Sequence, residues 1–243
     1  VFLDDKNFSK NLIGDLLIKN NKVNSLKLTS DFENNGKFKI EVKTLKNKKK
    51  TISFYSDNAE PFVKHFSFIK GFKEGRIDFF SVKEKDHSNS TLNIYDFKIK
   101  KMPALTKLLS LASLQGIADV MTGEGIRFNE FDMKFSNEKK LMTIDEIYAI
   151  GPAISVMMEG YVQKDKLVSL KGTLVPATTL NKVIGSIPFL GKILVGNKVG
   201  EGVFGVSFKI KGPPKKTKTT VNPIKTLTPR FITRTLEKIK KTN

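Results

Sequence analysis

Residues that could carry out catalysis or bind a metal ion are few in this sequence and lie far apart. The chain has no cysteine, and its 2 histidines are His65 and His87. Without cysteine it forms no disulfide, no thiolate metal site and no cysteine nucleophile. Neither histidine has the H-x-H or H-E-x-x-H neighbourhood that brings two imidazole rings to one metal ion. We therefore expect both histidines at the surface or at helix ends, and we predict no metal site and no catalytic residue.

The densest carboxylates are Asp4-Asp5 and Asp145-Glu146. An acid–base pair needs two groups within hydrogen-bond reach of a substrate, and groups distant in the sequence meet only in the fold. We interpret both sets as solvated turns. The sequence thus predicts no buried polar catalytic cluster and no enzymatic activity.

The stretch from Gly200 to Gly205 matches the G-x-G-x-x-G string of dinucleotide-binding folds. That string must follow a strand and open a helix, with an acidic residue about 20 positions further on. Here the glycines open an alternating, strand-like segment, and the next acidic residue is Glu237. We reject a nucleotide site and predict no cofactor.

The charge balance suggests an anionic partner. Lysine and arginine number 43 against 24 acidic residues, which gives a net charge of +19. Nucleic acid and anionic phospholipid both fit such a surface, and so does a lysine-rich composition without a ligand. The basic runs Lys46–Lys50 and Lys215–Lys218 lack interleaved aromatic residues and a recognition helix, which disfavours nucleic acid.

Alternation of apolar and polar residues predicts strands through most of the chain. Phe38, Ile40 and Val42 alternate with charged residues, and Lys46–Lys50 reads as a hairpin turn after them. Further strand-like segments are Ile126–Phe135, Leu141–Ile150, Ile154–Val162, Leu167–Val175 and Val203–Lys211, the last ended by Gly212-Pro213-Pro214. Short polar or glycine-containing connections favour an antiparallel meander.

Two breaks in this alternation predict bulges or bends in a curved sheet. Ile77 and Phe79 share one parity, whereas Phe80 and Val82 share the other. In the same way Leu92 and Ile94 give way to Phe97 and Ile99. A bulge restores the apolar residues to one face after such a change of phase.

Helical spacing occurs in several segments between and after the strands. Asp57 or Asn58 could cap a short helix through Phe66, and Pro103 begins an amphipathic helix that runs to Leu114. Thr178–Ile187 is also helix-like. Lys215–Val221 reads as an extended basic linker to a last helix within Pro223–Lys241.

That last helix carries apolar residues on one side and basic residues beside them, and it can dock on its own sheet or lie among lipid head groups. Docking is the commoner arrangement. Because a basic linker follows Gly212-Pro213-Pro214, we nevertheless expect few contacts to hold it. Deleting residues 224–243 should then spare the melting temperature and weaken flotation with anionic liposomes. The predicted membrane-contact residues are Phe231, Ile232, Arg234, Leu236, Lys238 and Ile239.

The order of several motifs resembles the C-terminal region of AsmA-like bacterial envelope proteins. The motifs begin with Leu105–Asp119 and Gly123–Phe128. They continue with Gly151-Pro152-Ala153-Ile154, Gly160-Tyr161-Val162, Leu170–Pro176, Ile187–Gly191, Gly200–Gly205, Lys211-Gly212-Pro213 and Val221-Asn222-Pro223. The resemblance covers roughly Leu92 to Ile239. Residues 1–90 contribute only compatible alternation.

Members of this family, including TamB-like and YhdP-like bridge proteins, are anchored in the inner membrane and cross the periplasm as a long curved sheet with an apolar inner face. The resemblance implies phospholipid passage between the inner and outer membranes, or support of outer-membrane assembly. It implies phospholipids, a membrane surface and outer-membrane-associated proteins as partners. Since the chain starts at Val1 and has no apolar run of about 20 residues, we expect the anchor upstream.

The predicted fold is mainly β with some α: an elongated, curved antiparallel sheet, groove-like, with a few amphipathic helices. We divide it into a β-rich segment (1–100), an AsmA-like sheet segment (101–222) and a basic C-terminal helix (223–243). An apolar face this long must be covered or must hold something apolar. The predicted lipid-groove residues are Phe38, Ile40, Val42, Phe204, Val206, Phe208 and Ile210. A nucleic-acid-binding or purely structural β-protein remains the alternative.

Overall fold

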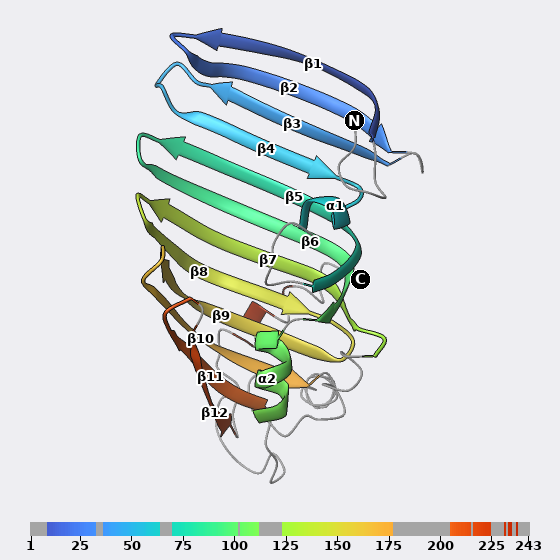
Figure 1. Cartoon of the computed structure of the whole chain (residues 1–243), viewed down its shortest axis with the longest axis vertical. Coiled ribbons are helices and arrows are strands. Elements are labelled where there is room, and N and C mark those ends of the chain that lie inside the picture. Colours follow the sequence, from blue (N-terminus) through green and yellow to red (C-terminus); the bar gives the residue numbers. More distant parts are fainter. Residues whose placement is uncertain are drawn as a thin grey trace.

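One open sheet of 12 antiparallel strands makes up most of this computed structural model (Figure 1). The structure describes residues 9–32, 36–63, 70–101, 103–111, 123–176, 205–214 and 216–224, together with 231, 233, 234 and 237. The strands lie side by side in sequence order, so each pairs with the strand that precedes or follows it in the chain. The predicted fold class, a curved antiparallel sheet with a few helices, is confirmed.

The strands are β1 (Ser9–Lys19), β2 (Lys22–Phe32), β3 (Lys37–Thr44), β4 (Lys50–Ser56), β5 (Lys70–Glu84), β6 (His87–Lys101), β7 (Ile126–Glu138), β8 (Leu141–Ile150), β9 (Ile154–Gln163), β10 (Leu167–Pro176), β11 (Gly205–Gly212) and β12 (Lys218–Ile224). Helix α1 (Glu60–Val63) follows β4, and helix α2 (Pro103–Leu111) follows β6. Because β6 pairs with β7 and β11 with β12, one sheet spans the predicted segments 1–100 and 101–222.

Tight turns connect each odd-numbered strand to the next, and these turns lie along one edge of the sheet, at the left in Figure 1. In the turn between β1 and β2, Asn20 and Asn21 have φ values of 50° and 58°. Two consecutive positive φ values are typical of the type I′ turn, whose twist matches that of the flanking strands. The predicted turn at Lys46–Lys50 is confirmed: Leu45 N donates to Lys49 O at 2.8 Å.

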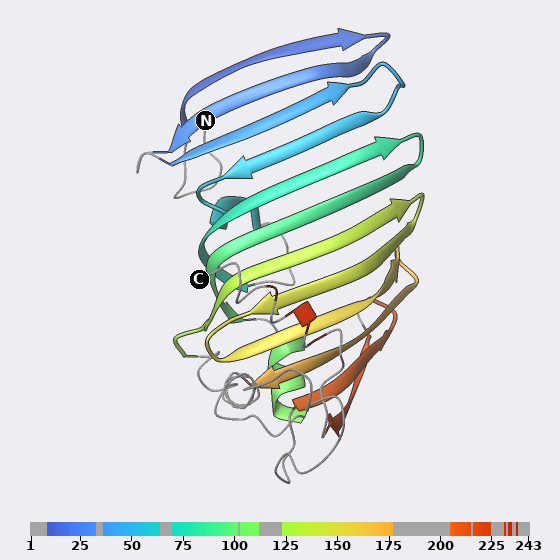
Figure 2. The same cartoon turned by 180° about the vertical axis from the view of Figure 1, so that it is seen from behind.

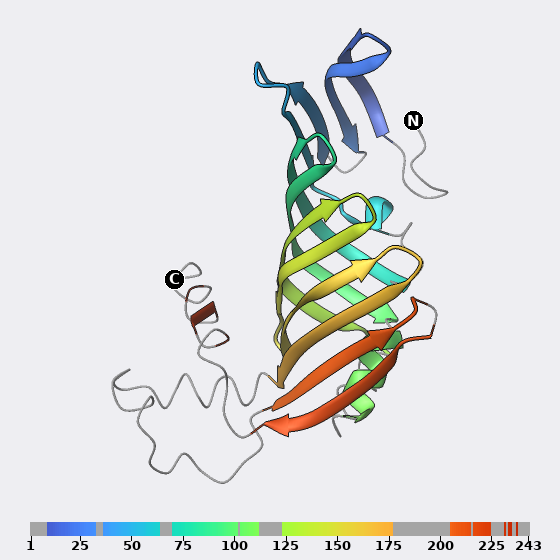
Figure 3. The ribbon, with the colours of Figure 1, turned by 90° about the vertical axis from the view of Figure 1, so that its left-hand side faces the viewer.

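Both helices cover the same face of the sheet, as the side view in Figure 3 shows. Helix α1 begins after Asn58, whose Oδ1 accepts a hydrogen bond from the Glu60 backbone at 3.1 Å, so the predicted cap is correct. Helix α2 begins at Pro103 as expected. Ala59 before α1 and Val63 within it join one hydrophobic core with residues of the sheet and with Leu105, Leu108 and Leu109 of α2.

The predicted change of phase in β6 is confirmed. Ile94 and Phe97 differ in parity, yet both belong to the core on the helix-covered face. The break occurs at Asp96, which has a φ of 53°, and Gly75 on β5 has a φ of 86°. Beyond the break, Phe97 stacks between Phe72 and Phe128 at centroid distances of 5.2 and 5.4 Å.

The predicted change of phase between Phe79 and Phe80 is wrong. The ladder from β4 to β5 continues in register through both residues, pairing Phe54 with Phe79 and Ser53 with Phe80. Phe79 therefore faces the core side, while Phe80 points to the other face and is 46% exposed. An apolar residue on the solvent-facing side of a strand produces the same sequence pattern as a bulge.

The segment predicted as an extended linker, Lys215–Val221, is in large part strand. Lys218–Val221 belongs to β12, which pairs with β11 from Lys211↔Lys218 to Gly205↔Ile224. The final strand is thus β12, and Gly212-Pro213-Pro214 forms the turn before it. The predicted helix Thr178–Ile187 lies outside the described residues. Among the described residues, no helix is long and apolar enough to cross a membrane.

Candidate functional site

Mainly apolar side chains form rows across the helix-covered face, because paired residues on neighbouring strands share a face. The middle row contains Leu28, Ile40, Phe54, Phe79, Leu92, Met133, Ile147, Met158, Gly172, Phe208 and Val221. The helix-side row contains Ser30, Phe38, Ser56, Ile77, Ile94, Phe131, Ala149, Val156, Leu174, Val206 and Pro223. The turn-side row contains Leu26, Val42, Ile52, Ser81, Ser90, Phe135, Ile144, Gly160, Leu170, Ile210 and Thr219.

Burial changes across these rows. In the helix-side row Phe38, Ile77 and Ile94 are buried, because Phe38 packs against Phe62 of α1, while Ile77 and Ile94 belong to the hydrophobic core. In the middle and turn-side rows, the residues that β2 to β4 contribute are half-buried. These are Leu26, Leu28, Ile40, Val42, Ile52 and Phe54. Within the part of the chain that the structure describes, an apolar strip therefore remains partly open between the helices and the turns.

The predicted lipid-groove residues that the structure describes all lie on this face. Phe38 and Val206 belong to the helix-side row, and both are buried. Phe208, in the middle row, is buried too. The half-buried members are Ile40, Val42 and Ile210, and Phe204 lies outside the described residues. Phe38 packs its ring against Phe32 and Phe62 at centroid distances of 5.9 and 5.8 Å, so it belongs to the core of the fold.

The opposite face is mainly polar. Lys27, Glu41 and Ser53 are cross-strand neighbours there, and a parallel row holds Lys39, Tyr55 and Asp78. Lys43 pairs with Glu41 at 2.9 Å, and its hydrogen bond lowers the pKa of that carboxyl. Such a sheet presents an apolar surface on one side and a polar surface to solvent on the other.

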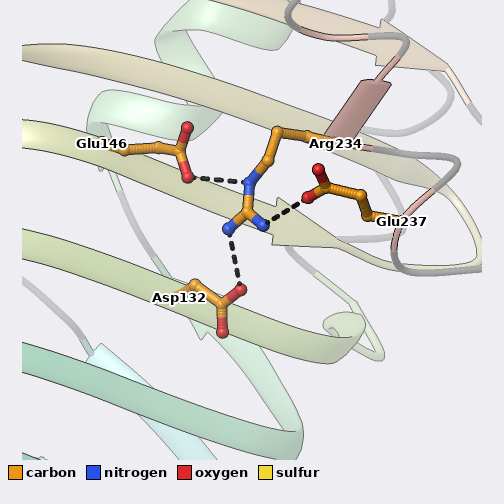
Figure 4. A network of polar contacts seen from close by, with 4 residues as sticks. All are labelled: Asp132, Glu146, Arg234 and Glu237. Carbon is orange, nitrogen blue, oxygen red and sulfur yellow. Dashed lines mark hydrogen bonds and ion pairs between the residues drawn. The ribbon is translucent and has the colours of Figure 1, made fainter. Parts of the chain in front are cut away.

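A charged cluster interrupts this polar face, as the close view in Figure 4 shows. The Arg234 guanidinium contacts Glu146 through Nε at 2.8 Å, Asp132 through Nη2 at 3.3 Å and Glu237 through Nη1 at 3.1 Å. Burial alone would lower the pKa of Arg234, but the three carboxylates outweigh it and raise that pKa. Arg234 also lies over the Tyr148 ring, 5.7 Å from its centroid. The cluster fixes the C-terminal segment against β7 and β8.

Phe231 lies beside this cluster and is fully buried. Its ring meets Tyr148 edge to face at 6.0 Å, and both side chains are 0% exposed. Seen from behind in Figure 2, the dark red part of the C-terminal segment lies in front of the sheet, on the face opposite to α2.

The expectation that few contacts hold the C-terminal segment is therefore wrong for Phe231 and Arg234. Phe231 has no exposed ring to offer a membrane, and Arg234 is neutralised by carboxylates of the sheet. The other predicted membrane-contact residues, Ile232, Leu236, Lys238 and Ile239, lie outside the described residues.

The prediction that Asp145-Glu146 forms a solvated turn is wrong, because both residues lie inside β8. A shift in register opposite Lys134 and Phe135 of β7 turns the Glu146 side chain to the polar face. Glu146 is buried there. Its partner Arg234 is far along the chain, and no local pattern indicated that the two would meet. His65 and Asp4-Asp5 lie outside the described residues, while His87 is exposed and hydrogen-bonded to Asn89 at 3.1 Å.

These arrangements determine what chemistry the described residues can support. The carboxylates of the charged cluster face a guanidinium, and no group of three or more metal-ligating side chains gathers within the described ranges. The partly open apolar rows offer a long surface for apolar ligands. In comparisons with known proteins, the chain matches no protein-family model, no curated protein and no solved structure.

Proposed function

We propose that this chain holds the acyl chains of phospholipids on the partly open apolar rows, as a non-enzymatic part of an AsmA-like envelope protein. The observation that carries the proposal is the continuity of these rows from β2 to β12, with a polar face behind them. A monomeric soluble protein rarely leaves so long an apolar strip partly exposed without using it.

The energetics of acyl chains suit such a surface. Burial of each methylene contributes about 0.8 kcal/mol, and the attraction has no preferred direction. The middle row consists mostly of aliphatic and aromatic side chains such as Ile40, Phe54 and Leu92, and these can accept a chain at any position along its length. No catalytic side chain is needed for such binding.

The wider role that we propose follows from the resemblance to AsmA-like proteins. There the chain serves in the periplasm, carried by an inner-membrane anchor, and supports phospholipid passage between the two membranes or outer-membrane assembly. Its partners are then phospholipids and a membrane surface or outer-membrane-associated proteins. The continuous sheet supports this role, because lipids could move along the middle row from strand to strand over mainly apolar side chains.

Lipid bound to natively purified protein tests the binding proposal. We expect mass spectrometry of the wild-type chain to detect phospholipid. The double variant Val42→Asp/Ile52→Asp places two charges in the turn-side row, and it should carry much less lipid because a carboxylate opposes burial of acyl chains.

The matched control is Thr51→Asp/Thr91→Asp, which places the same charges on the polar face opposite Lys43 and Lys134. Cross-strand pairs of opposite charge are tolerated there, so the control should retain its lipid. Wild-type protein without phospholipid, or equal losses in both variants at equal stability, would argue for a purely structural sheet.

A further inference from the structure

The fold gathers lysines from distant parts of the sequence along one edge of the sheet. The hairpin turns that follow β1, β3, β5, β7, β9 and β11 all lie at this edge, which we call the basic edge (Figure 1). Exposed lysines in these turns include Lys46, Lys85, Lys139, Lys140, Lys164 and Lys166. The acidic residues of the same turns, Glu84, Asp86, Glu138 and Asp165, are outnumbered by lysines.

Neighbouring turns touch from the β5–β6 turn to the β9–β10 turn, so this part of the basic edge is continuous. The backbone of Lys139 donates to Asp86 O at 3.5 Å, and that of Lys164 donates to Lys140 O at 2.9 Å. In the described part of these turns, one ion pair forms, between Lys49 and Glu84 at 2.9 Å. Most of the lysine charge at this edge therefore remains available to an external anion.

Basic residues near the other edge of the sheet have acidic partners instead. Lys73 contacts Glu60 at 2.6 Å, and Arg127 contacts Glu74 at 3.0 Å. Lys98 also approaches Glu74, at 4.0 Å. These ion pairs offset part of the basic charge near that edge, in contrast to the lysines of the hairpin turns.

The basic edge adjoins the partly open part of the apolar face. Lys50 and Lys83 are cross-strand partners two residues from Ile52 and Ser81 of the turn-side row, and they share its face. Two residues of a strand span about 7 Å. The helices cover the far side of the face, whereas the half-buried rows lie next to the lysines.

We propose that the basic edge binds the anionic head groups of phospholipids whose acyl chains lie on the turn-side and middle rows. This inference rests on the proposed function, and it adds a preference for anionic over zwitterionic head groups. Each lysine near an anionic lipid surface contributes attraction worth about a fivefold change in binding. Acyl chains alone would not discriminate, because both lipid classes share them.

A competition between lipids tests the preference. The purified chain is incubated with vesicles containing equal amounts of phosphatidylglycerol and phosphatidylcholine with the same acyl chains, then separated from the vesicles by gel filtration. Mass spectrometry of the bound lipid should show phosphatidylglycerol enriched about fivefold. The variant Lys46→Gln/Lys140→Gln/Lys164→Gln/Lys166→Gln should bind the same total lipid with little enrichment.

A control variant removes the same charge from the polar face: Lys27→Gln/Lys39→Gln/Lys134→Gln/Lys209→Gln. These lysines are exposed and lie away from the turns. The control should retain the enrichment, and unchanged unfolding curves would exclude loss of fold in either variant.

The outcomes separate this inference from the proposed function. Lipid bound without enrichment, or enrichment lost equally in both variants, would overturn the inference and leave lipid binding intact. No bound lipid of either class would contradict the proposed function itself. Loss of oligonucleotide binding in the edge variant, with unchanged lipid enrichment, would assign the basic edge to nucleic acid and also overturn the inference.

Discussion

Arg234 shows how a positive charge can be held against a sheet by carboxylates. Moving a guanidinium and carboxylates out of water is costly, and their mutual attraction offsets that cost only when the geometry is good. Here the three guanidinium nitrogens each face a different carboxylate. Removing one partner should therefore cost more than the intact cluster contributes.

Replacing Arg234 with alanine should lower the free energy of unfolding by about 3 kcal/mol, because the buried Asp132 and Glu146 would lose this cation. Urea unfolding measures this loss. Arg234→Ala combined with Asp132→Asn and Glu146→Gln should recover a large part of it, since the two carboxylates that faced the guanidinium are then uncharged as well. If the triple variant is no more stable than Arg234→Ala, the loss comes from packing over Tyr148 instead of from charge.

Asp57 links the connection after β4 to β3 and introduces a dependence on pH. Its carboxylate accepts hydrogen bonds from the Tyr55 hydroxyl and, at 2.9 Å, from the Lys37 backbone. The Tyr55 hydrogen bond is the main cause that lowers the pKa of Asp57 below its ordinary value of 3.8. The same hydrogen bond raises the pKa of Tyr55.

A lowered carboxyl pKa in the folded state means that its stabilisation is present above pH 3.8 and disappears as the pH falls through the folded-state pKa. Asp57→Asn removes the charge, so wild type should exceed the variant by at most about 1 kcal/mol near pH 7, given the exposure of the site. The difference should shrink as the pH falls below 3.8. Urea unfolding at neutral and at acidic pH measures it, and a difference that does not shrink in acid would contradict the electrostatic cause.

Individual residues of the candidate site differ in how well the sequence predicted them. Ile40 and Val42 could be placed on one apolar face because strand alternation is local. The membership of both in rows that reach β12 depends on registers between strands, and alternation alone does not specify those. The contact between Asp132 and Arg234 joins residues 102 positions apart, and nothing near either residue indicated it.

At the scale of elements, alternation predicted strands well where the wet face carries charged residues, as in β3. It failed at β12, because lysines and threonines dominate Lys218–Val221 and few apolar residues mark its inner face. The shift of phase in β6 was predicted because Leu92 and Ile94 are followed by Phe97 and Ile99. The apparent shift at Phe80 was not real, because an exposed apolar residue carries the same signal as a bulge.

Phe231 tests whether the C-terminal segment contributes to the stability of the sheet. Phe231→Ala should lower the free energy of unfolding by about 3 kcal/mol or more, since a fully buried ring against Tyr148 would be lost. Deleting residues 225–243 should destabilise at least as much, contrary to the expectation from sequence. Thermal and urea unfolding measure both changes.

Phe80→Ala is the matched control, because Phe80 lies on the same polar face but is 46% exposed. Its replacement should change stability by well under 1 kcal/mol, as for most exposed positions. Equal effects of the two substitutions would show that the burial of Phe231 does not stabilise the fold.

At the scale of the whole molecule, the described sheet is open and each terminal strand pairs with one neighbour. Strand β1 pairs with β2 alone, and its apolar residues are exposed on both faces. Ile13 and Leu17 lie on the polar face with Thr29 and Ser25, while Leu16 lies on the apolar face with Leu26. An exposed, apolar edge strand is a template for pairing with another chain.

Isolated molecules of this chain should therefore associate through β1. Ile13→Lys/Leu17→Lys should reduce association, because charges on an edge strand oppose pairing with another strand. Light scattering as a function of protein concentration measures the change.

Ile13 is 70% exposed and Leu17 45% exposed, so the free energy of unfolding should change by less than about 1 kcal/mol. Ile13 and Leu17 lie on the face opposite to the apolar rows, so lipid binding should be unaffected. Association that persists in this variant would place the contact elsewhere. The variant Leu141→Lys/Tyr161→Lys would then test the turn edge of β8 and β9, because Leu141 is 42% exposed and Tyr161 38% exposed.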